Sequence, residues 1–320
     1  MAPAPAAAIA HADPPDPGDG SFGVRLVDVP AALVNDPRAR HYVIDNLTPG
    51  TGVRRRVEVV NSSDATLRVD VYPAAARISH GSFTGAAGAT PNELSSWTRP
   101  NRRTLDIPAH GSARDTVTIT VPRDAAPGER YAVIWAQVTG QRSSGISLVS
   151  RSGIRMYLSV GGHNPPASNF TAHTMTAERG PGGLRLVHAR ITNTGGRALD
   201  LSGALTLSSA RGSLHAGPYA VELGTSLAPG QSEPVTAPVT DEVIDGPWHA
   251  TLELRSGLLD KKIRATITFP PQRGITTAAV TASNSPDTLE LGMLAAGVTL
   301  IAGSTALIAT TRRRRRQEPR

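Results

Sequence analysis

The residues best suited to bind a ligand lie together in one segment without a clear strand pattern, residues 73–104. They combine one aromatic ring with amide and guanidinium groups: Trp97, Arg99, Asn101, Arg102 and Arg103. An exposed indole can stack on a sugar, and a guanidinium can pair with a carboxylate through two hydrogen bonds. This combination predicts a site for peptidoglycan or another surface polymer. Alternatively, Trp97 closes the open end of the fold and the arginines form a solvated rim.

Residue patterns of catalytic and metal sites are missing. The 9 histidines are scattered along the chain, and no two of them have the spacing of metal ligands. The sequence contains no GxSxG, SxxK, P-loop or HExxH pattern. Cysteine is absent, which excludes disulfides, a cysteine nucleophile and thiolate metal sites. We therefore expect a non-catalytic protein that uses no cofactor and no metal.

The positive charge is concentrated at one end of the chain. The formal net charge is +7, and five successive arginines occupy residues 312–316. Arg320 adds one more positive charge and Glu318 removes one, so residues 1–311 are close to neutral. Because nucleic-acid binding requires a concentrated basic surface on the folded domain, a nucleic-acid partner is not expected.

A hydrophobic segment precedes these arginines. Residues 289–311 are predominantly apolar, and Glu290 is their one charged residue. About 20 apolar residues in a helix span a bilayer, and basic flanking residues remain on the cytoplasmic side. We expect residues 289–311 to form a single transmembrane helix and residues 312–320 a cytoplasmic Arg-rich tail. The protein would then lie in the cell membrane as a single-pass protein, with its N-terminal domains extracellular.

The N-terminus has part of an export signal. Residues 1–20 begin with an alanine-rich stretch that ends in Ala10-His11-Ala12, an A-x-A pattern. We interpret them as a signal-peptide remnant and a disordered tail. A disordered alanine-proline tail without a signal is the alternative.

Two stretches between these ends share one order of strand and turn signals. In residues 21–162, alternating apolar runs such as Val53 to Val60 are separated by turn residues such as Asn61-Ser62-Ser63. In residues 163–270, Asn193-Thr194-Gly195 stands at the equivalent position after a similar run. The pattern predicts an all-β protein with two tandem immunoglobulin-like β-sandwiches. Residues 271–288 read as a polar stalk, and Trp135 and Trp248 as core residues.

The first stretch resembles the WxL-interacting cell-surface protein family of Gram-positive bacteria, as a divergent actinobacterial-type member. The resemblance is carried by the order of several strand and turn motifs: Tyr42-Val43-Ile44, Pro49-Gly50, Asn61-Ser62-Ser63, Gly81-Ser82-Phe83, Ile107-Pro108 and Val121-Pro122. It implies that the first domain binds peptidoglycan and that the second binds a partner.

Two functions are therefore open. In the first, the chain is a membrane-anchored surface protein that binds peptidoglycan or another envelope component and presents a partner surface. In the second, it is a chaperone-like or assembly module, in which an unpaired strand edge binds another envelope protein by strand pairing.

Overall fold

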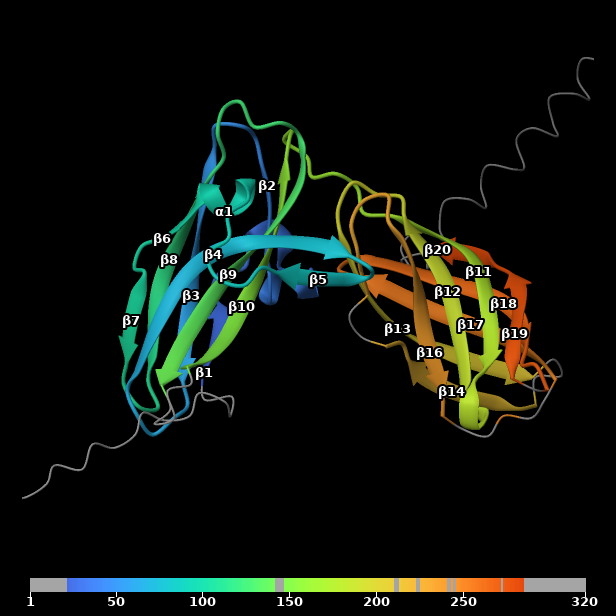
Figure 1. The fold of residues 1–320 in the computed structure, drawn as a ribbon. Helices are drawn as coiled ribbons and strands as arrows, with labels where there is room; N and C mark the ends of the chain where they lie inside the picture. The colour runs from blue at the N-terminus through green and yellow to red at the C-terminus, as the bar shows by residue number, and fades with distance from the viewer. Residues whose placement is uncertain are drawn as a thin grey trace, which may run out of the picture. The chain divides into compact units, whose positions relative to one another are not determined.

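The computed structural model describes residues 22–141, 147–209, 213–222, 225–240, 243, 246–271 and 273–284. These residues form four β-sheets, which pack as two β-sandwiches (Figure 1). The predicted all-β class is confirmed. The predicted signal remnant, transmembrane helix and Arg-rich tail lie outside the described residues. No helix within the described ranges has both the length and the apolar character needed to cross a membrane.

The first sandwich contains strands β1 to β10. Its smaller sheet has four strands in the order β1 (Phe22–Leu26), β3 (Gly52–Asn61), β8 (Ser112–Thr120) and β6 (Thr98–Pro100). Its larger sheet has the order β2 (Val43–Leu47), β10 (Ser147–Val160), β9 (Gly128–Gln141), β4 (Leu67–Ser79) and β5 (Ser82–Gly85), and β7 (Thr104–Ile107) also pairs with β4. Three short helices connect the strands: η1 (Ala31–Leu33), η2 (Pro37–Arg40) and α1 (Glu93–Trp97).

Alternation of apolar and polar residues places the core between these two sheets. Val57 and Val59 of β3 are fully buried, and Val117 and Ile119 of β8 are buried beside them. Ile134 of β9 packs into the same cluster from the opposite sheet. Because side chains along a strand alternate between two faces, each of these strands contributes its apolar residues to one core.

The second sandwich contains strands β11 to β20. One sheet has the order β16 (Ser232–Val239), β12 (Arg185–Asn193), β11 (Phe170–Arg179) and β19 (Gly274–Ala279). The other has the order β14 (His215–Ala220), β13 (Leu199–Ser209), β17 (Pro247–Ser256), β18 (Leu259–Thr268) and β20 (Thr281–Asn284), with β15 (Thr225–Leu227) on β13. A short turn, η3 (Pro181–Gly183), joins β11 to β12. Trp248 is buried in this core, as expected.

The prediction of a polar stalk over residues 271–288 is wrong for its first part. Strand β19 pairs antiparallel with β11 from Thr174 opposite Ala279 to Arg179 opposite Gly274. Strand β20 follows in the other sheet, beside β18. Threonines and alanines make this segment look polar and small, yet Ala278 packs against the hydrophobic core. The second sandwich therefore continues to Asn284.

Candidate functional site

Trp97 is not exposed as a stacking surface. It is the last residue of α1, a helix that begins with a capping box between Asn92 and Ser95. Its side chain is half-buried and packs against the core of the first sandwich. The guanidinium of Arg130 lies over the indole, 5.1 Å from the ring centroid. The structure therefore places Trp97 as in the alternative interpretation, against the end of the sandwich.

Asn101 and Arg102 hold the turn after β6 against β8. The backbone N–H of Asn101 donates to the carbonyl of Thr116 over 2.9 Å. The backbone N–H of Arg102 donates to Oδ2 of Asp115 over 3.0 Å, and its guanidinium Nε lies 3.6 Å from Oδ1. Asp115 is buried, so it needs these partners. Arg102 therefore neutralises a carboxylate of its own domain.

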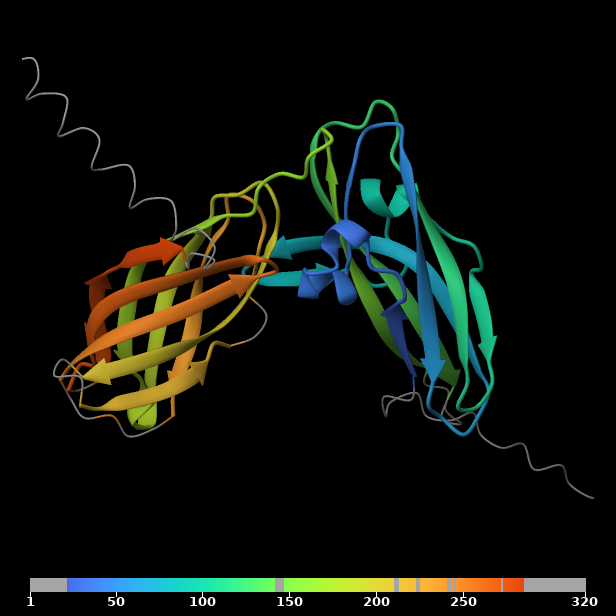
Figure 2. The same ribbon diagram turned by 180° about the vertical axis from the view of Figure 1, so that it is seen from behind.

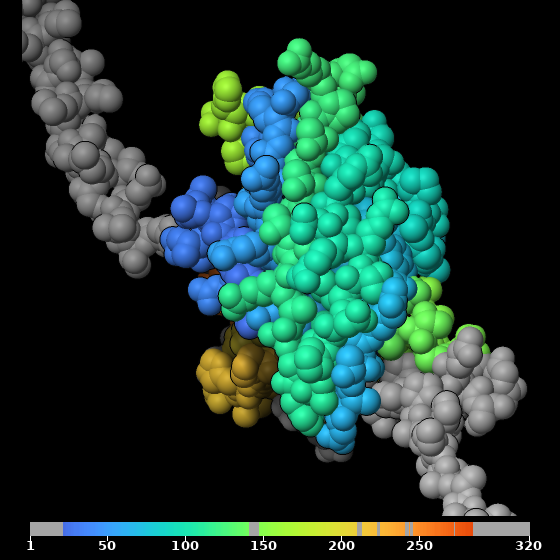
Figure 3. All heavy atoms as spheres, turned by 90° about the vertical axis from the view of Figure 1, so that its left-hand side faces the viewer, coloured from blue at the N-terminus to red at the C-terminus, as the bar shows by residue number. Residues whose placement is uncertain are grey.

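Arg99 and Arg103 line a pocket between β4 and β6 with a volume of about 580 Å³. Figure 3 views the first sandwich from the side on which β6, β7 and β8 lie. Both arginines are exposed, and neither guanidinium has a hydrogen-bond or ion-pair partner in the part of the chain that the structure describes. The sequence-based site is thus divided: two of its five residues share a pocket and three do not line it.

A second feature is an edge of β10 that is only partly paired; the sequence predicts an unpaired strand edge but does not locate it. This strand has 14 residues, all paired with β9. On its other side β2 pairs in parallel with Met156 to Val160 alone. Among the described residues no strand pairs with the remaining nine, from Ser147 to Arg155, on that side. We call this segment the β10 edge.

The register shows which backbone groups of the β10 edge are free to pair. The N–H of Gly161 donates to the carbonyl of Leu47, on the β2 side. Successive residues of a strand direct their backbone groups to opposite sides. Counting back in steps of two, the N–H and C=O groups of Val149, Arg151 and Gly153 face outward. These groups have the spacing that an added strand requires.

Three of the other edge strands contain proline, whereas β1, β2, β5, β19 and β20 contain none. Prolines occur in β6, β14 and β16: Pro100, Pro218, Pro234 and Pro238. Proline has no N–H and interrupts an added ladder, which is how many proteins protect sheet edges. The β10 edge contains no proline, and the side chain of Val149 is 41% exposed on it. The β10 edge thus has no proline that would prevent pairing with a further strand.

Strand β1 lies beside the β10 edge without pairing with it (Figure 2). The N–H of Val24 donates to Oγ of Ser152 over 3.3 Å, which links the borders of the two sheets. On the outer face, Nε of Arg151 donates to Oε1 of Gln137 over 2.7 Å, and Tyr72 donates its hydroxyl to the same oxygen. Arg151 is thus held along its own sheet.

The strand pattern predicts β10 only from Ile154 onward. Leu148 and Val149 are a weak signal for its first half, because Ser150, Ser152 and Gly153, which follow them, are residues typical of turns. Serine at positions 150 and 152 hides the alternation, since it replaces the apolar residues expected on the inner face. Within the described ranges no group of three or more histidine and acidic residues is placed to hold a metal ion.

No protein-family model matches the chain, and no curated protein matches it in sequence. Among solved structures it is similar to the YadV chaperone, with 11% identity and a TM-score of 0.39 over 83% of this chain and 100% of that one. It is also similar to the E. coli chaperone DraB, with 13% identity and a TM-score of 0.38 over 68% and 90%. A complex of the Salmonella enterica SafA pilin with the SafB chaperone gives 10% identity and a TM-score of 0.40 over 74% and 92%. At these TM-scores the similarity carries no information about function.

Proposed function

We propose that this chain is a non-catalytic binding module that receives a β-strand from another protein along the β10 edge. The observation that carries the proposal is the nine-residue run from Ser147 to Arg155 without a strand partner opposite β9. In strand addition, the main-chain hydrogen bonds supply affinity and the alternate side chains supply specificity. The outward groups of Val149, Arg151 and Gly153 would form the ladder.

The geometry favours this function over polymer binding through Trp97. Sugar stacking requires an open aromatic face, and the face of Trp97 is covered by Arg130. The compartment remains the one expected from the sequence: the apolar residues 289–311 and the following arginines favour a cell-surface protein, so the partner would be another envelope protein.

The first test is site-specific crosslinking in cells that produce the full chain. A photo-crosslinking residue at Arg151 is expected to form an adduct with one protein. Val149→Pro removes an outward N–H that has no strand partner among the described residues, so it should abolish the adduct and leave the unfolding midpoint nearly unchanged. Val149→Thr retains the N–H and should retain the adduct. A crosslinker at Leu258, which is 68% exposed in the second sandwich, is the control position.

Hydrogen exchange on the purified complex gives an independent readout. Partner binding should slow exchange at Val149, Arg151 and Gly153, whereas Ser150 and Ser152, which face β9, are already protected. Adducts with glycan and none with protein would contradict the proposal. So would an adduct that persists unchanged in Val149→Pro.

A further inference from the structure

The pocket that contains Arg99 and Arg103 lies at a break in the edge of β4. On this edge β7 pairs with Leu67 to Asp70, and β5 pairs with Ala76 to Ser79. Strand β4 is separated from β10 by β9, so the break is on a different edge from the proposed strand-binding site.

The backbone on either side of this break is already satisfied. The N–H of Val71 donates to the carbonyl of Arg103 over 2.8 Å, and that of Ala75 donates to the carbonyl of Thr90 over 2.7 Å. Residue 73, midway between them, is a proline, so no N–H is left unpaired there. Backbone groups of alternate residues in a strand point to the same side. The carbonyl of Pro73 therefore faces the break, as the N–H groups of Val71 and Ala75 do. The break therefore presents a hydrogen-bond acceptor, the carbonyl of Pro73, at the position where an extended peptide chain would donate an N–H.

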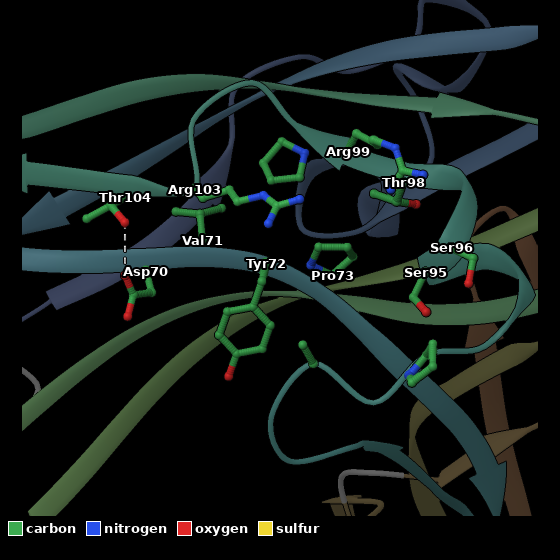
Figure 4. Close-up of a pocket in the computed structure, with 13 residues that line it drawn as sticks. Asp70, Val71, Tyr72, Pro73, Ser95, Ser96, Thr98, Arg99, Arg103 and Thr104 are labelled. Carbon is green, nitrogen blue, oxygen red and sulfur yellow. Dashed lines mark hydrogen bonds between the residues drawn. The ribbon is translucent and has the colours of Figure 1, made fainter.

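Two cations stand beside this acceptor. In Figure 4 Arg99 and Arg103 lie on one side of the β4 ribbon, and the guanidinium of Arg103 is turned toward Pro73. The one carboxylate of the lining, Asp70, accepts a hydrogen bond from Thr104 over 3.1 Å. The pocket thus carries two positive charges against one negative charge. Its remaining lining includes the apolar residues Ala89, Pro91 and Pro100.

We propose that this pocket binds a short acidic peptide in an extended conformation. A peptide N–H would donate to the carbonyl of Pro73, and its carboxylates would pair with Arg99 and Arg103. The volume of about 580 Å³ lies within the range of pockets that bind small ligands and suits a few residues. A peptide fits better than a sugar acid, because the acceptor belongs to a sheet edge and the aromatic residue of the lining, Tyr72, lies on the other side of the β4 ribbon from the two arginines (Figure 4).

Calorimetric titration of the purified full chain tests the proposal. The probe is the capped tetrapeptide Ac-Ala-Glu-Ala-Glu-NH2, and its Gln-for-Glu counterpart has the same shape without charge. The acidic peptide should bind, and the neutral one should bind at least about tenfold more weakly. Arg99→Gln and Arg103→Gln should each weaken binding about fivefold or more. Arg68→Gln removes an exposed arginine of β4 outside the pocket and should leave the affinity unchanged.

Two further ligands separate the possible chemistries. A peptide that is N-methylated at its central amides keeps its charge and loses its donors, so it should bind more weakly than the parent peptide. Trigalacturonate supplies carboxylates on a sugar and should not bind. The proposal is overturned if trigalacturonate binds in place of the peptide, if the neutral peptide binds equally, or if Arg68→Gln has the same effect as the pocket variants. Because Val149→Pro leaves this pocket intact, failure of strand binding and failure of peptide binding are distinguishable.

Discussion

Asn61 and Asn193 occupy equivalent positions in the two sandwiches and make equivalent hydrogen bonds. Each side-chain amide donates to the carbonyl of the residue four positions later, Ala65 over 2.7 Å and Arg197 over 2.8 Å. Each also donates to a backbone carbonyl far away in the sequence: Asn61 to that of Ile107 over 3.1 Å, and Asn193 to that of Leu227 over 2.9 Å. Both asparagines are fully buried. The two turns that look alike in the sequence are therefore held by the same pattern of hydrogen bonds from a buried asparagine.

Replacement of either asparagine should destabilise its sandwich. Asn61→Ala removes donors from buried carbonyls, and an unsatisfied buried polar group costs about 1–3 kcal/mol. We expect a loss of about 2 kcal/mol in the free energy of unfolding, measured by urea denaturation, for Asn61→Ala and a similar loss for Asn193→Ala. The exposed Asn101→Ala is the control, with a change within about 0.5 kcal/mol. Equal stability of Asn61→Ala and wild type would contradict this account.

Gly153 is required by the indole ring of Trp135. A Cβ at position 153 would lie 2.6 Å from two ring carbons, and one at Gly85 would lie 2.8 Å from a third. Trp135 donates its Nε1–H to the carbonyl of Ala86 over 2.9 Å, so the ring has little freedom to move. Gly153→Ala should therefore cost about 1–3 kcal/mol and shift tryptophan fluorescence.

Gly161→Ala is the matched control for Gly153→Ala. A Cβ at Gly161 meets no atom within 4 Å, and its φ needs no glycine. Its free energy of unfolding should match that of the wild type. Similar losses for the two variants would show that the clash with Trp135 is not the cause.

Asp28 should make stability depend on pH in the acid range. Its carboxylate accepts from Nε of Arg56 over 3.0 Å and from the backbone N–H of Arg56 over 2.8 Å. The side-chain hydrogen bond from Arg56 is the main cause that lowers the pKa of Asp28. A lowered pKa contributes stability above the unfolded-state pKa of about 3.9, and this stability is lost as the pH falls through the folded-state pKa.

The test compares wild type with Asp28→Asn by urea denaturation from pH 2 to 8 at low salt. Because the pair is partly exposed, the difference in unfolding free energy at pH 7 should be below about 1 kcal/mol. It should stay constant above pH 5 and shrink as the pH falls below 4. A difference that grows with falling pH would contradict the assignment.

Arg130 should stabilise the first sandwich through Trp97. Its guanidinium stacks on the indole and its Nε pairs with Glu93 over 2.8 Å. Arg130→Gln should lower the free energy of unfolding by about 1 kcal/mol. In a double-mutant cycle with Trp97→Leu, the coupling between the two side chains should account for most of that loss. If the effects of the two substitutions on the free energy of unfolding are additive, the loss in Arg130→Gln comes from its ion pair with Glu93 instead.

The strand pattern of the sequence predicts much of the fold because alternation and turn residues act locally. The run from Val53 to Val60 lies in strand β3 as expected, and the turn after Asn61 is repeated after Asn193. Local pattern does not show which face of a strand of small residues meets the core, so the sequence predicts a stalk where β19 packs Ala278 against the core.

The candidate site was less predictable, because it depends on tertiary neighbours. Trp97 looks available in the sequence, and only the fold shows that Arg130, from β9, covers it. The break beside Pro73 arises where β5 and β7 stop short of each other along β4, which no local pattern reveals. Arg99 and Arg103 were identified from residue type alone, and the pocket is what brings them together.

Pro73 also affects which sheet edge misassembled copies of this protein would pair through. A growing fibril needs consecutive main-chain donors and acceptors along one border, and position 73 supplies only an acceptor. Intermolecular stacking of misassembled copies would therefore begin on the β10 side of the sheet rather than on the β4 side, and occupancy of that side by a partner would suppress it.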